Sequence, residues 1–591
     1  MMDNNTDARW PKVLIAGAGV GGLTLGVILQ KSDIPYEIFE RASEIKPLGS
    51  GLYLTANIAP LFKQLGIYEE LITQGKPNNE FQVFNEQRQL QYTMEFRNQT
   101  EQFGAHSHYY SRPAFYDFLY RQVPKERVHL GKKIISTEQD KDGVLIRCSD
   151  GTEYKGDILV GADGAYSTVR QNLYKGLKEA TKLPATDALP LPFSTVRVGG
   201  LTRPLDVTEF PDLAKETCQF IQIVGDGKPY SWITQTTIQN RISFGVVRYL
   251  DEELSRDDNT FLNEEWGPGA AEAMCDEVRD FPVVSGGDKI LTIGDLIDLT
   301  PKEYISKVML EEKVFQTWFG GRTVLLGDAC HKFSPAGGAG ASNAIHDAIV
   351  LANYIHALPK NATIEDMEKS FQAYQDERMP WVLEASGNSK IFKTMTTRTI
   401  AGALLRTFTR HMPQWLQSKN AIRMTINRPQ LYWLPQIEDT GSVKAAPQPS
   451  LSLQSSTAVA VGPIYAGTST ATGVEAVTTT VTATVRPQST DSAAGNSFRA
   501  ATRSTLPQTA SSSYPAQQMP LCGHRILRAA HPLELQRRSF IYPVSIPPSH
   551  HPQVRQDAGA SSTLSTSQKK ARGTAITLLL VPTQPLSRLV K

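Results

Sequence analysis

The stretch from Lys12 to Glu40 reads KVLIAGAGVGGLTLGVILQKSDIPYEIFE. It opens with a short apolar run at 13–16, continues through three spaced glycines into an apolar helical segment, and ends in a second apolar strand. Strand, glycine turn, helix and strand in this order are typical of a βαβ unit that binds a dinucleotide. The stretch therefore predicts a Rossmann-like fold at the N-terminus.

The glycines at Gly17, Gly19 and Gly22 have G-x-G-x-x-G spacing, and each has a separate physical task. Gly17 permits the tight turn, Gly19 lets the backbone approach a pyrophosphate, and Gly22 allows the helix to pack closely on the strand. The helix start offers free N–H groups and a positive dipole end to the phosphates. Glu40 ends the second strand, where its carboxylate can accept hydrogen bonds from ribose hydroxyls.

A second polar segment follows an apolar strand about 300 residues later, in LLGDACHKFSPAGGAGASNAIHDAIVLA, residues 325–352. Asp328 ends the strand, and Gly338 and Gly340 precede a helix that is predicted to begin at about Ala341. Apolar residues at helical spacing give this helix one buried face, at positions 341, 344, 345, 348, 352 and 355.

Two cofactor segments favour FAD over NAD, because FAD is long enough to need both of its ends held. The N-terminal motif suits the adenosine end. Asp328 can accept a hydrogen bond from a ribityl hydroxyl, and the glycines let backbone N–H groups reach the flavin. A helix start aimed at the ring would stabilise the negative charge of the reduced flavin.

Two further segments lie between these motifs. Asp163 and Gly164 follow an apolar strand in DILVGADGAYSTVR, a dipeptide that is also common in plain turns. Arg112 precedes Pro113 at a predicted helix start, which is a good seat for a phosphate.

Together these motifs resemble the single-component flavoprotein monooxygenases of the para-hydroxybenzoate hydroxylase class, over about residues 10–445. The likeness extends to fungal FAD-dependent monooxygenases, which share the ending RPQ…LP…ED.GSV and often oxidise secondary metabolites. The resemblance implies that Asp163 contributes to FAD and NAD(P)H binding, that Arg112 lies near the flavin, and that Gly51 belongs to a loop under it.

The same resemblance implies the chemistry. NADH or NADPH would reduce the flavin, O₂ would add to give a flavin C4a-hydroperoxide, and a hydrophobic or aromatic small molecule would be hydroxylated or epoxidised. No metal site and no protein nucleophile stand out, so no catalytic residue is assigned. Tyr230, Trp232 and Phe244 could line the substrate pocket, although sheet packing is the stronger expectation for each.

Other candidate side chains have ordinary interpretations. His331 is expected to be structural or solvent-facing, and Cys330 to be a small packing residue. His106 and His108 are expected at the surface. The five cysteines are scattered without a C-x-x-C pair, so neither a zinc site nor a dithiol centre is indicated.

Rival functions within the fold lack their signatures. The W-x-W-x-I-P of flavin-dependent halogenases is absent, and no second G-x-G-x-x-G follows a strand, as disulfide reductases and Baeyer–Villiger-type enzymes would require. A different FAD-dependent oxidoreductase, a halogenase-like enzyme or a non-catalytic FAD-binding protein stays open.

The net charge differs between the two parts of the chain. From Leu451 onward there are 13 Lys and Arg against 4 Asp and Glu, or +9; the remainder has 48 against 55, or −7, which together give the net +2. A mildly acidic globular part argues against nucleic acid as a partner. No apolar run approaches the ~18 residues of a membrane helix, so a cytoplasmic protein is expected; the oligomeric state stays open.

The expected fold class is α/β, with a Rossmann-like FAD-binding domain interleaved with a mixed-sheet substrate domain. The predicted division places FAD-binding segments at 10–180 and 311–400, the substrate sheet at 181–310, and a helical and loop closure at 401–449. Residues 450–591 are rich in Ser, Thr, Ala and Pro, and are predicted to form a disordered basic tail. Its deletion should leave the FAD content intact.

Overall fold

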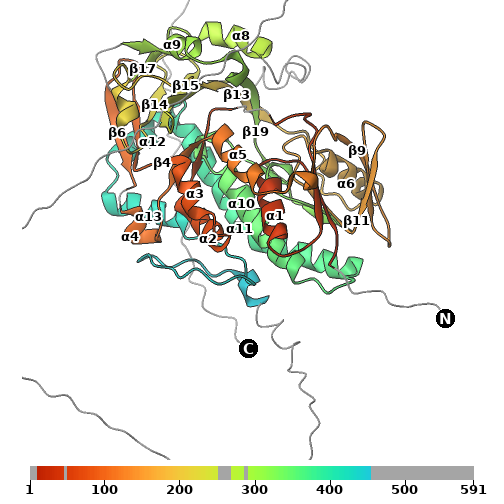
Figure 1. Cartoon of the computed structure of the whole chain (residues 1–591). Coiled ribbons are helices and arrows are strands. Elements are labelled where there is room, and N and C mark those ends of the chain that lie inside the picture. The colour runs from red at the N-terminus through yellow and green to blue at the C-terminus, as the bar shows by residue number, and fades with distance from the viewer. Residues whose placement is uncertain (1–9, 46–48, 97, 251–267, 285–289, 454–591) are drawn as a thin grey trace, which may run out of the picture. The chain divides into compact units, whose positions relative to one another are not determined.

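The structure is a computed structural model that describes residues 10–45, 49–96, 98–250, 268–284 and 290–453 (Figure 1). The described chain has the predicted α/β class, with two main sheets that alternate along the sequence. The prediction of a disordered tail at 450–591 lies outside the described residues, except for its first four positions.

The first sheet has six strands in the order β21-β22-β12-β1-β2-β8. Its four central strands are parallel and almost fully buried, as their unbroken apolar sequences require. The strands are β1 Val13–Ala16, β2 Tyr36–Phe39, β8 Val128–His129, β12 Ile158–Gly161, β21 Phe319–Gly320 and β22 Thr323–Leu325.

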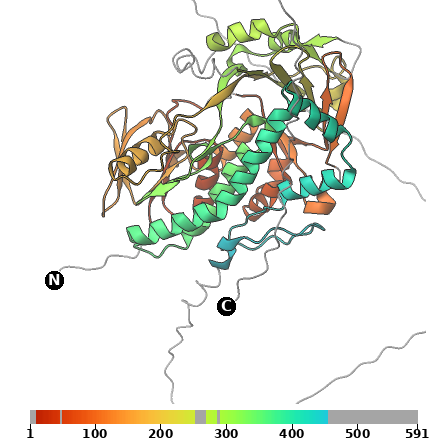
Figure 2. The ribbon, with the colours of Figure 1, turned by 180° about the vertical axis from the view of Figure 1, so that it is seen from behind.

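Two buried helices pack against each other beside this sheet, α1 (Val20–Gln30) and α10 (Gly340–His356). Gly21 makes the close packing possible, because a Cβ there would lie 2.5 Å from Cδ1 of Leu326. Helix α11 (Ile364–Met395) packs on α10 and runs across the back of the fold, as Figure 2 shows. Its Lys393 reaches Glu312 and Ser194 near the second sheet, so α11 ties the two sheets together.

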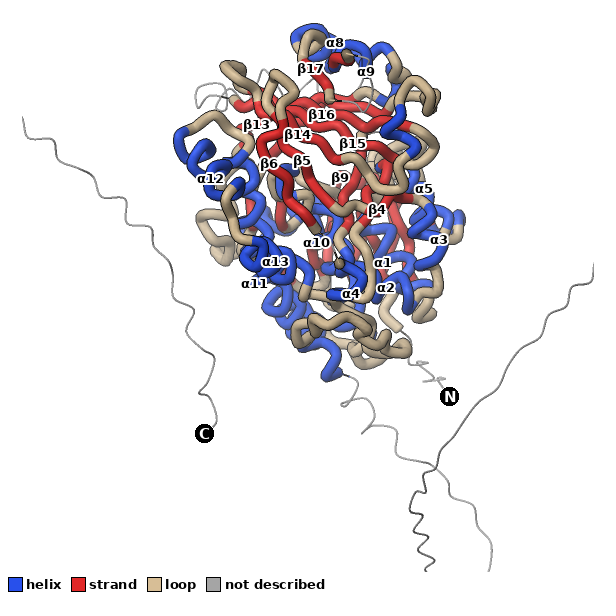
Figure 3. The backbone as a smooth tube through the Cα atoms, turned by 90° about the vertical axis from the view of Figure 1, so that its left-hand side faces the viewer, coloured by secondary structure: helices blue, strands red, loops and turns tan. Residues whose placement is uncertain are grey.

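The second sheet has seven strands in the order β19-β13-β16-β15-β14-β5-β6. They are β5 Glu80–Phe84, β6 Leu90–Glu95, β13 Phe193–Leu201, β14 Phe220–Val224, β15 Tyr230–Thr237, β16 Arg241–Tyr249 and β19 Ser306–Glu311. Helices α8 (Pro268–Glu277) and α9 (Ile293–Asp298) lie beyond one face of this sheet in Figures 1 and 3. The sequence division differs here, since β5 and β6 fall within the range assigned to the FAD-binding part.

Shorter elements complete the described chain. Two three-stranded sheets consist of β3 Gly51–Leu54, β7 His108–Ser111 and β4 Gly75–Pro77, and of β9 Ile134–Gln139, β10 Val144–Cys148 and β11 Glu153–Gly156. Two strand pairs are β17 Pro282–Val283 with β18 Leu291–Thr292, and β20 Lys313–Val314 with β23 His331–Lys332. The remaining α-helices are α2 Ala59–Gln64, α3 Tyr68–Thr73, α4 Gln99–Phe103, α5 Arg112–Arg121, α6 Thr168–Glu179, α12 Ile400–Arg410 and α13 Gln414–Thr425. None of the described helices combines the length and apolarity needed to cross a bilayer.

The predicted closure at 401–449 continues slightly further than its expected end. Ser450 is fully buried, its N–H donates to Glu377 Oε2 at 2.9 Å, and its hydroxyl donates to Glu377 Oε1 at 3.0 Å. The same hydroxyl accepts from Asn353 Nδ2 of α10 at 3.0 Å. The closing segment therefore includes Ser450, past its predicted end at residue 449.

This boundary gives a truncation test. A chain ending at residue 453 is expected to keep the melting temperature and FAD content of the full chain. A chain ending at residue 445 removes Ser450 and leaves the half-buried Glu377 carboxylate short of partners, which should lower the free energy of unfolding by about 1–3 kcal/mol. Thermal unfolding of the three chains side by side measures the difference. Equal stability of the 445 and 453 chains would show that the Ser450 anchor contributes nothing.

Candidate functional site

The predicted cofactor residues follow four neighbouring parallel strands at the same sheet edge. Ala16 pairs with Phe39 on one side and Gly161 on the other, and Gly161 pairs with Leu325. The next residues along these strands lead into Gly17, Glu40, Asp163 and Asp328. The carboxyl edge of an open parallel sheet is where such folds bind ligands, and the structure brings all four segments to it.

The first glycines have the geometry that their spacing predicts. Gly17 has φ +98°, and a Cβ there would lie 2.5 Å from the carbonyl oxygen of Ala162. A Cβ on Gly22 would lie 2.1 Å from the carbonyl oxygen of Gly17. Gly19 differs from both, because the nearest described atom to its Cβ position is 3.9 Å away. Gly17 and Gly22 are thus required by the fold itself, while a Cβ on Gly19, at the start of α1, would make only an ordinary van der Waals contact.

Glu40 is held against the glycine turn. Its Oε2 accepts from the N–H of Ala18 and its Oε1 accepts from the N–H of Ala42, both at 2.9 Å. The carboxylate oxygens keep further lone pairs, so a hydroxyl of a ligand can still donate to them. This fixed position beside the turn fits a ribose contact.

Asp163 has one satisfied and one free carboxylate oxygen. Its Oδ2 accepts from the N–H groups of Thr168 at 2.7 Å and Val169 at 3.2 Å, at the start of α6. Its Oδ1 is buried and has no hydrogen-bond partner among the described residues. Burial raises the pKa of this carboxyl above its ordinary value. A buried, unpaired acceptor beside Gly17 is an observation that points to a polar ligand, and it goes beyond the simple turn that the sequence allowed.

Asp328 lies just after β22, in the 3₁₀ turn η6 (Gly327–Ala329), and forms an ion pair with Lys332. Burial acts to lower the pKa of the Lys332 ammonium, but the Asp328 carboxylate outweighs it and the net direction is upward. The charge of Arg112 also acts on Lys332, and the charges of Arg112 and Glu40 both act on the phenol of Tyr116. The structure therefore brings the exposed Arg112 side chain into the same neighbourhood as the two acidic strand ends.

Helices α1 and α10 both begin without a side-chain cap, at Gly19 and Ala339. Helices α2, α3, α4 and α13 also lack such a cap, whereas α5, α6, α11 and α12 each begin with a Ser or Thr hydroxyl that accepts from a backbone N–H. Helix α10 starts at Gly340, one residue before the predicted Ala341, and no described atom lies within 4 Å of the Gly340 Cβ position. Uncapped N–H groups and the helix dipole favour negative charge at both starts.

A buried charge network that the sequence did not reveal holds the second cofactor segment, residues 325–352, in place. Asp347 of α10 accepts from the N–H of Gly327 at 2.9 Å and contacts His331 Nε2 at 2.6 Å, both through Oδ2. Its Oδ1 accepts from Arg378 Nε of α11 at 2.7 Å. His331 was expected to be either structural or solvent-facing. It is structural, because its side chain is buried and bonded to Asp347.

Cys330, His331 and Asp347 place three potential metal ligands within 4.8 Å of one another. Both Asp347 oxygens are already engaged by Arg378, His331 and a backbone N–H. The cluster is consequently a compensated ion pair, in agreement with the interpretation of Cys330 as a packing residue.

Gly51 has a packing role in β3. A Cβ at Gly51 would lie 1.9 Å from the hydroxyl oxygen of Tyr109, which itself donates to Gln235 Oε1 at 2.9 Å. The neighbouring Gly49 approaches the proposed phosphate residue more closely, since its Cβ position is 2.8 Å from Cδ of Arg112. The 49–51 segment thus connects Arg112 to the seven-stranded sheet.

Arg197 of β13 is a charged residue that the sequence analysis did not identify. It bonds to Ser50 and lies over Gly245 of β16, whose Cβ position is 2.3 Å from the guanidinium Nη2. Burial lowers the pKa of Arg197. Gly199 and Gly245 face each other across β13 and β16. Glycines inside two strands were a usable signal, because they often mark a close approach by another group.

Tyr230, Trp232 and Phe244 belong to the packed core between the seven-stranded sheet and helices α8 and α9. Trp232 donates its indole N–H to the Pro282 carbonyl at 2.8 Å. The sheet-packing expectation is correct for these three residues. The surface position expected for His108 is wrong: it is buried in β7, where burial lowers its pKa to about 4.

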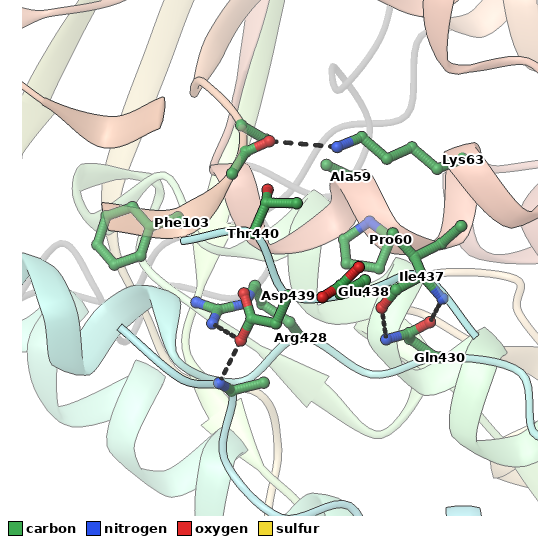
Figure 4. A pocket seen from close by; sticks show the side chains of 13 residues that line it. Ala59, Pro60, Lys63, Phe103, Arg428, Gln430, Ile437, Glu438, Asp439 and Thr440 are labelled. Atoms are coloured by element: carbon green, nitrogen blue, oxygen red, sulfur yellow. Dashed lines mark hydrogen bonds and ion pairs between the residues drawn. The ribbon is translucent and has the colours of Figure 1, made fainter. Parts of the chain in front are cut away.

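A small pocket lies elsewhere, between α2 and the closing segment (Figure 4). Arg428 in its wall donates to Asp439 Oδ2 at 2.7 Å and to the Val443 carbonyl at 2.6 Å, and Lys63 donates to the Gly104 carbonyl at 3.2 Å. These two basic side chains already have protein partners, and the contacts of Arg428 fasten the closing segment.

Together, the residues at the strand ends fit an extended dinucleotide cofactor with two polar ends. The fit rests on the unpaired Asp163 oxygen, the open Cβ positions of Gly19 and Gly340, and the two uncapped helix starts. Gly338, with φ +60°, lies two residues before the start of α10, and its Cβ position is 3.6 Å from a ring carbon of Tyr53.

Comparison with known proteins gives the same result. The profile of the family described as "FAD binding domain" matches residues 11–211 and 292–388. The FAD-dependent monooxygenase ptmM of Penicillium ochrochloron is 30% identical over 408 residues, covering 65% of this chain and 86% of that protein. The FAD-dependent monooxygenase paxM of Penicillium paxilli is 28% identical, covering 62% and 75%.

A solved structure of Klebsiella pneumoniae HpxO, complexed with FAD and uric acid, superposes with a TM-score of 0.55 at 19% identity. It covers 70% of this chain and 95% of that chain, which shows a shared fold. The family profile spans both segments that form the four strand ends. The chain therefore belongs to the FAD-dependent monooxygenases that carry this FAD binding domain.

Proposed function

We propose that this monooxygenase takes electrons from NADH or NADPH and uses O₂ to hydroxylate or epoxidise a hydrophobic, aromatic-type small molecule. The observation that carries the substrate class is a group of aromatic rings beside the Gly338 turn. Tyr53 packs on Phe81 at 5.1 Å between ring centroids, and Phe81 packs on Phe220 at 4.2 Å. Phe96 contacts the same Phe81 ring at 4.8 Å.

These four rings are only half-buried, unlike the core aromatic residues of the same sheet. Tyr53 brings the group next to Gly338, one of the proposed flavin-contact residues. Half-buried rings can offer free faces and edges to a planar apolar ligand. This group takes the place of Tyr230, Trp232 and Phe244, which pack on the other side of the sheet.

The residues proposed to hold FAD have distinct tasks. Gly17, Gly19 and Gly22 would receive the pyrophosphate at the start of α1, and Glu40 the ribose. Asp163 and Asp328 would accept from hydroxyls, and Arg112 would neutralise a phosphate. Gly338, Gly340 and Ala341 would present backbone N–H groups at the start of α10. When bound, FAD supplies the hydride acceptance and oxygen activation that no side chain here provides.

The proposal predicts a yellow protein whose NADH or NADPH oxidation accelerates when a suitable aromatic compound is added. A screen of hydrophobic aromatic compounds, scored by NAD(P)H consumption, identifies the substrate. Mass spectrometry of the product formed under ¹⁸O₂ should then show one labelled oxygen atom. The two nucleotides, tested at equal concentration, establish which is the reductant.

Different failures have different meanings. Substrate turnover without O₂ would indicate another kind of FAD-dependent oxidoreductase, and halide in the product a halogenase-like enzyme. A yellow protein that neither nucleotide reduces, with or without ligands, would indicate a non-catalytic FAD-binding protein. Each of these results would overturn the monooxygenase chemistry proposed for this site.

A further inference from the structure

Helix α12 (Ile400–Arg410) turns a row of large apolar side chains toward solvent. Ile400 is 83% exposed, Leu404 is 66% exposed and Phe408 is 54% exposed. They are four residues apart, so they lie one above another on a single face of the helix. The opposite face, with the buried Gly402 and Thr409, packs on α11 and β6.

The next helix adds an exposed indole. Trp415 of α13 is 68% exposed and follows Phe408 after a short turn. In Figure 3, α12 lies at the edge of the described fold. An apolar row of this size on one short surface helix is unusual for a side that meets only water.

The stretch of sequence that carries this row is basic, although β6, on which α12 packs, ends in Glu95. Between Glu384 and Glu438 the chain has no Asp or Glu and carries eight basic side chains: Lys390, Lys393, Arg398, Arg406, Arg410, Lys419, Arg423 and Arg428. Three of them pair with acids elsewhere, as Lys393, Arg423 and Arg428 do. Four others are exposed and have no ion pair among the described residues, namely Lys390, Arg398, Arg410 and Lys419.

A second copy of this chain fits the face poorly. A two-fold contact would place the same patch on both sides, and the four unpaired cations would then face like charges. A three-turn helix also offers less area than the ~800 Å² per partner of a stable protein interface. Apolar side chains bordered by cations, with an indole at one end, are instead the composition of helices that lie in a lipid interface.

We propose that α12 and the start of α13 form a docking face for an anionic phospholipid surface. Ile400, Leu404, Phe408 and Trp415 enter the boundary between headgroups and acyl chains. The exposed cations around them meet the lipid phosphates and carboxylates. This interaction is peripheral, it is separate from the cofactor residues, and it does not depend on which compound the enzyme oxidises.

The test uses the full chain and vesicles of phosphatidylcholine with or without phosphatidylserine. Co-sedimentation is expected with the phosphatidylserine vesicles, and it should weaken as the salt concentration rises. The double variant Leu404→Asn/Phe408→Asn is expected to bind these vesicles at least about tenfold more weakly. Its FAD content and melting temperature should match those of the unchanged protein, because both side chains are exposed.

The matched control is Leu189→Asn/Ile135→Asn, which changes two apolar residues that are 62% and 54% exposed elsewhere on the fold. This control should bind like the unchanged chain. Absence of binding to phosphatidylserine vesicles, or equal binding by all three proteins, overturns the proposal. So does a self-association, seen by sedimentation velocity, that the 404/408 variant abolishes, since a second copy would then cover this face. The basic residues beyond 453 are the same in all three proteins and cannot cause the difference.

Discussion

Purified Gly19→Val protein is expected to fold normally and to be colourless. The nearest described atom to the Gly19 Cβ position is 3.9 Å away, so the protein itself has room for a larger side chain. That room is where the proposed pyrophosphate meets the start of α1. A valine there should weaken FAD binding by roughly 100-fold or more, or about 2.7 kcal/mol. Flavin absorbance per protein, followed by FAD titration, measures the loss.

Gly340→Val tests the other end of the same cofactor. No described atom lies within 4 Å of the Gly340 Cβ position, at the uncapped start of α10. The control is Gly176→Val in the exposed middle of α6, another glycine with nothing within 4 Å. Loss of FAD is expected at positions 19 and 340 and not at 176. Normal FAD binding by a folded Gly19→Val protein would show that the pyrophosphate lies somewhere else.

Asp347→Ala is expected to cause the largest loss of stability in the described chain. The substitution leaves Arg378 as a buried charge without its partner and removes the acceptor of the Gly327 N–H. Breaking a buried ion pair from one side costs roughly 3–5 kcal/mol. The surface pair Lys132–Asp150 serves as control, and Asp150→Ala should cost much less stability than Asp347→Ala. Chemical unfolding of the three proteins measures the two differences.

The same residue predicts an acid dependence. Burial alone would raise the pKa of the Asp347 carboxyl, but the charges of His331 and Arg378 outweigh it, so the net direction is well below the ordinary value. A lowered pKa in the folded state means that the stabilisation is complete above the unfolded-state pKa of about 3.9. It is lost as the pH falls below that value. The unchanged protein should therefore lose more stability below about pH 4 than Asp347→Ala does. If both proteins lost the same free energy of unfolding as the pH falls below about 4, this assignment would be contradicted.

Much of the cofactor end of the fold could be predicted from the sequence, because its signals are local. The turn at Gly17, the tight packing at Gly22 and the acid at Glu40 all lie within one βαβ unit of about thirty residues. The second segment was recognisable for the same reason, since Asp328 and Gly340 flank one turn. Helix α10 begins within one residue of its predicted start.

The rest depends on contacts between residues that are distant in sequence. Asp347 looks like an ordinary polar position on a helix until α11 brings Arg378 against it. Strands β5 and β6 carry no mark that assigns them to the second sheet, where β5 pairs with β14 across Phe81 and Phe220. The aromatic group that we propose to face the substrate was missed for this reason. Sheet packing, the stronger expectation for Tyr230, Trp232 and Phe244, is confirmed, but alternation along a strand does not say which face of the sheet meets the cofactor.

The order of strands in the six-stranded sheet has a consequence during synthesis. Strand β1 lies beside β12, and β12 lies beside β22, so the sheet edge that gathers the cofactor residues comes from three widely separated parts of the chain. At roughly 5–20 residues per second, a ribosome needs about 15–60 s to travel from Gly17 to Asp328. During that interval the nascent chain first carries β1 without its neighbour β12, and then β12 without its neighbour β22. The four strand ends that we propose to hold the flavin are therefore all present only after more than half of the chain has been translated.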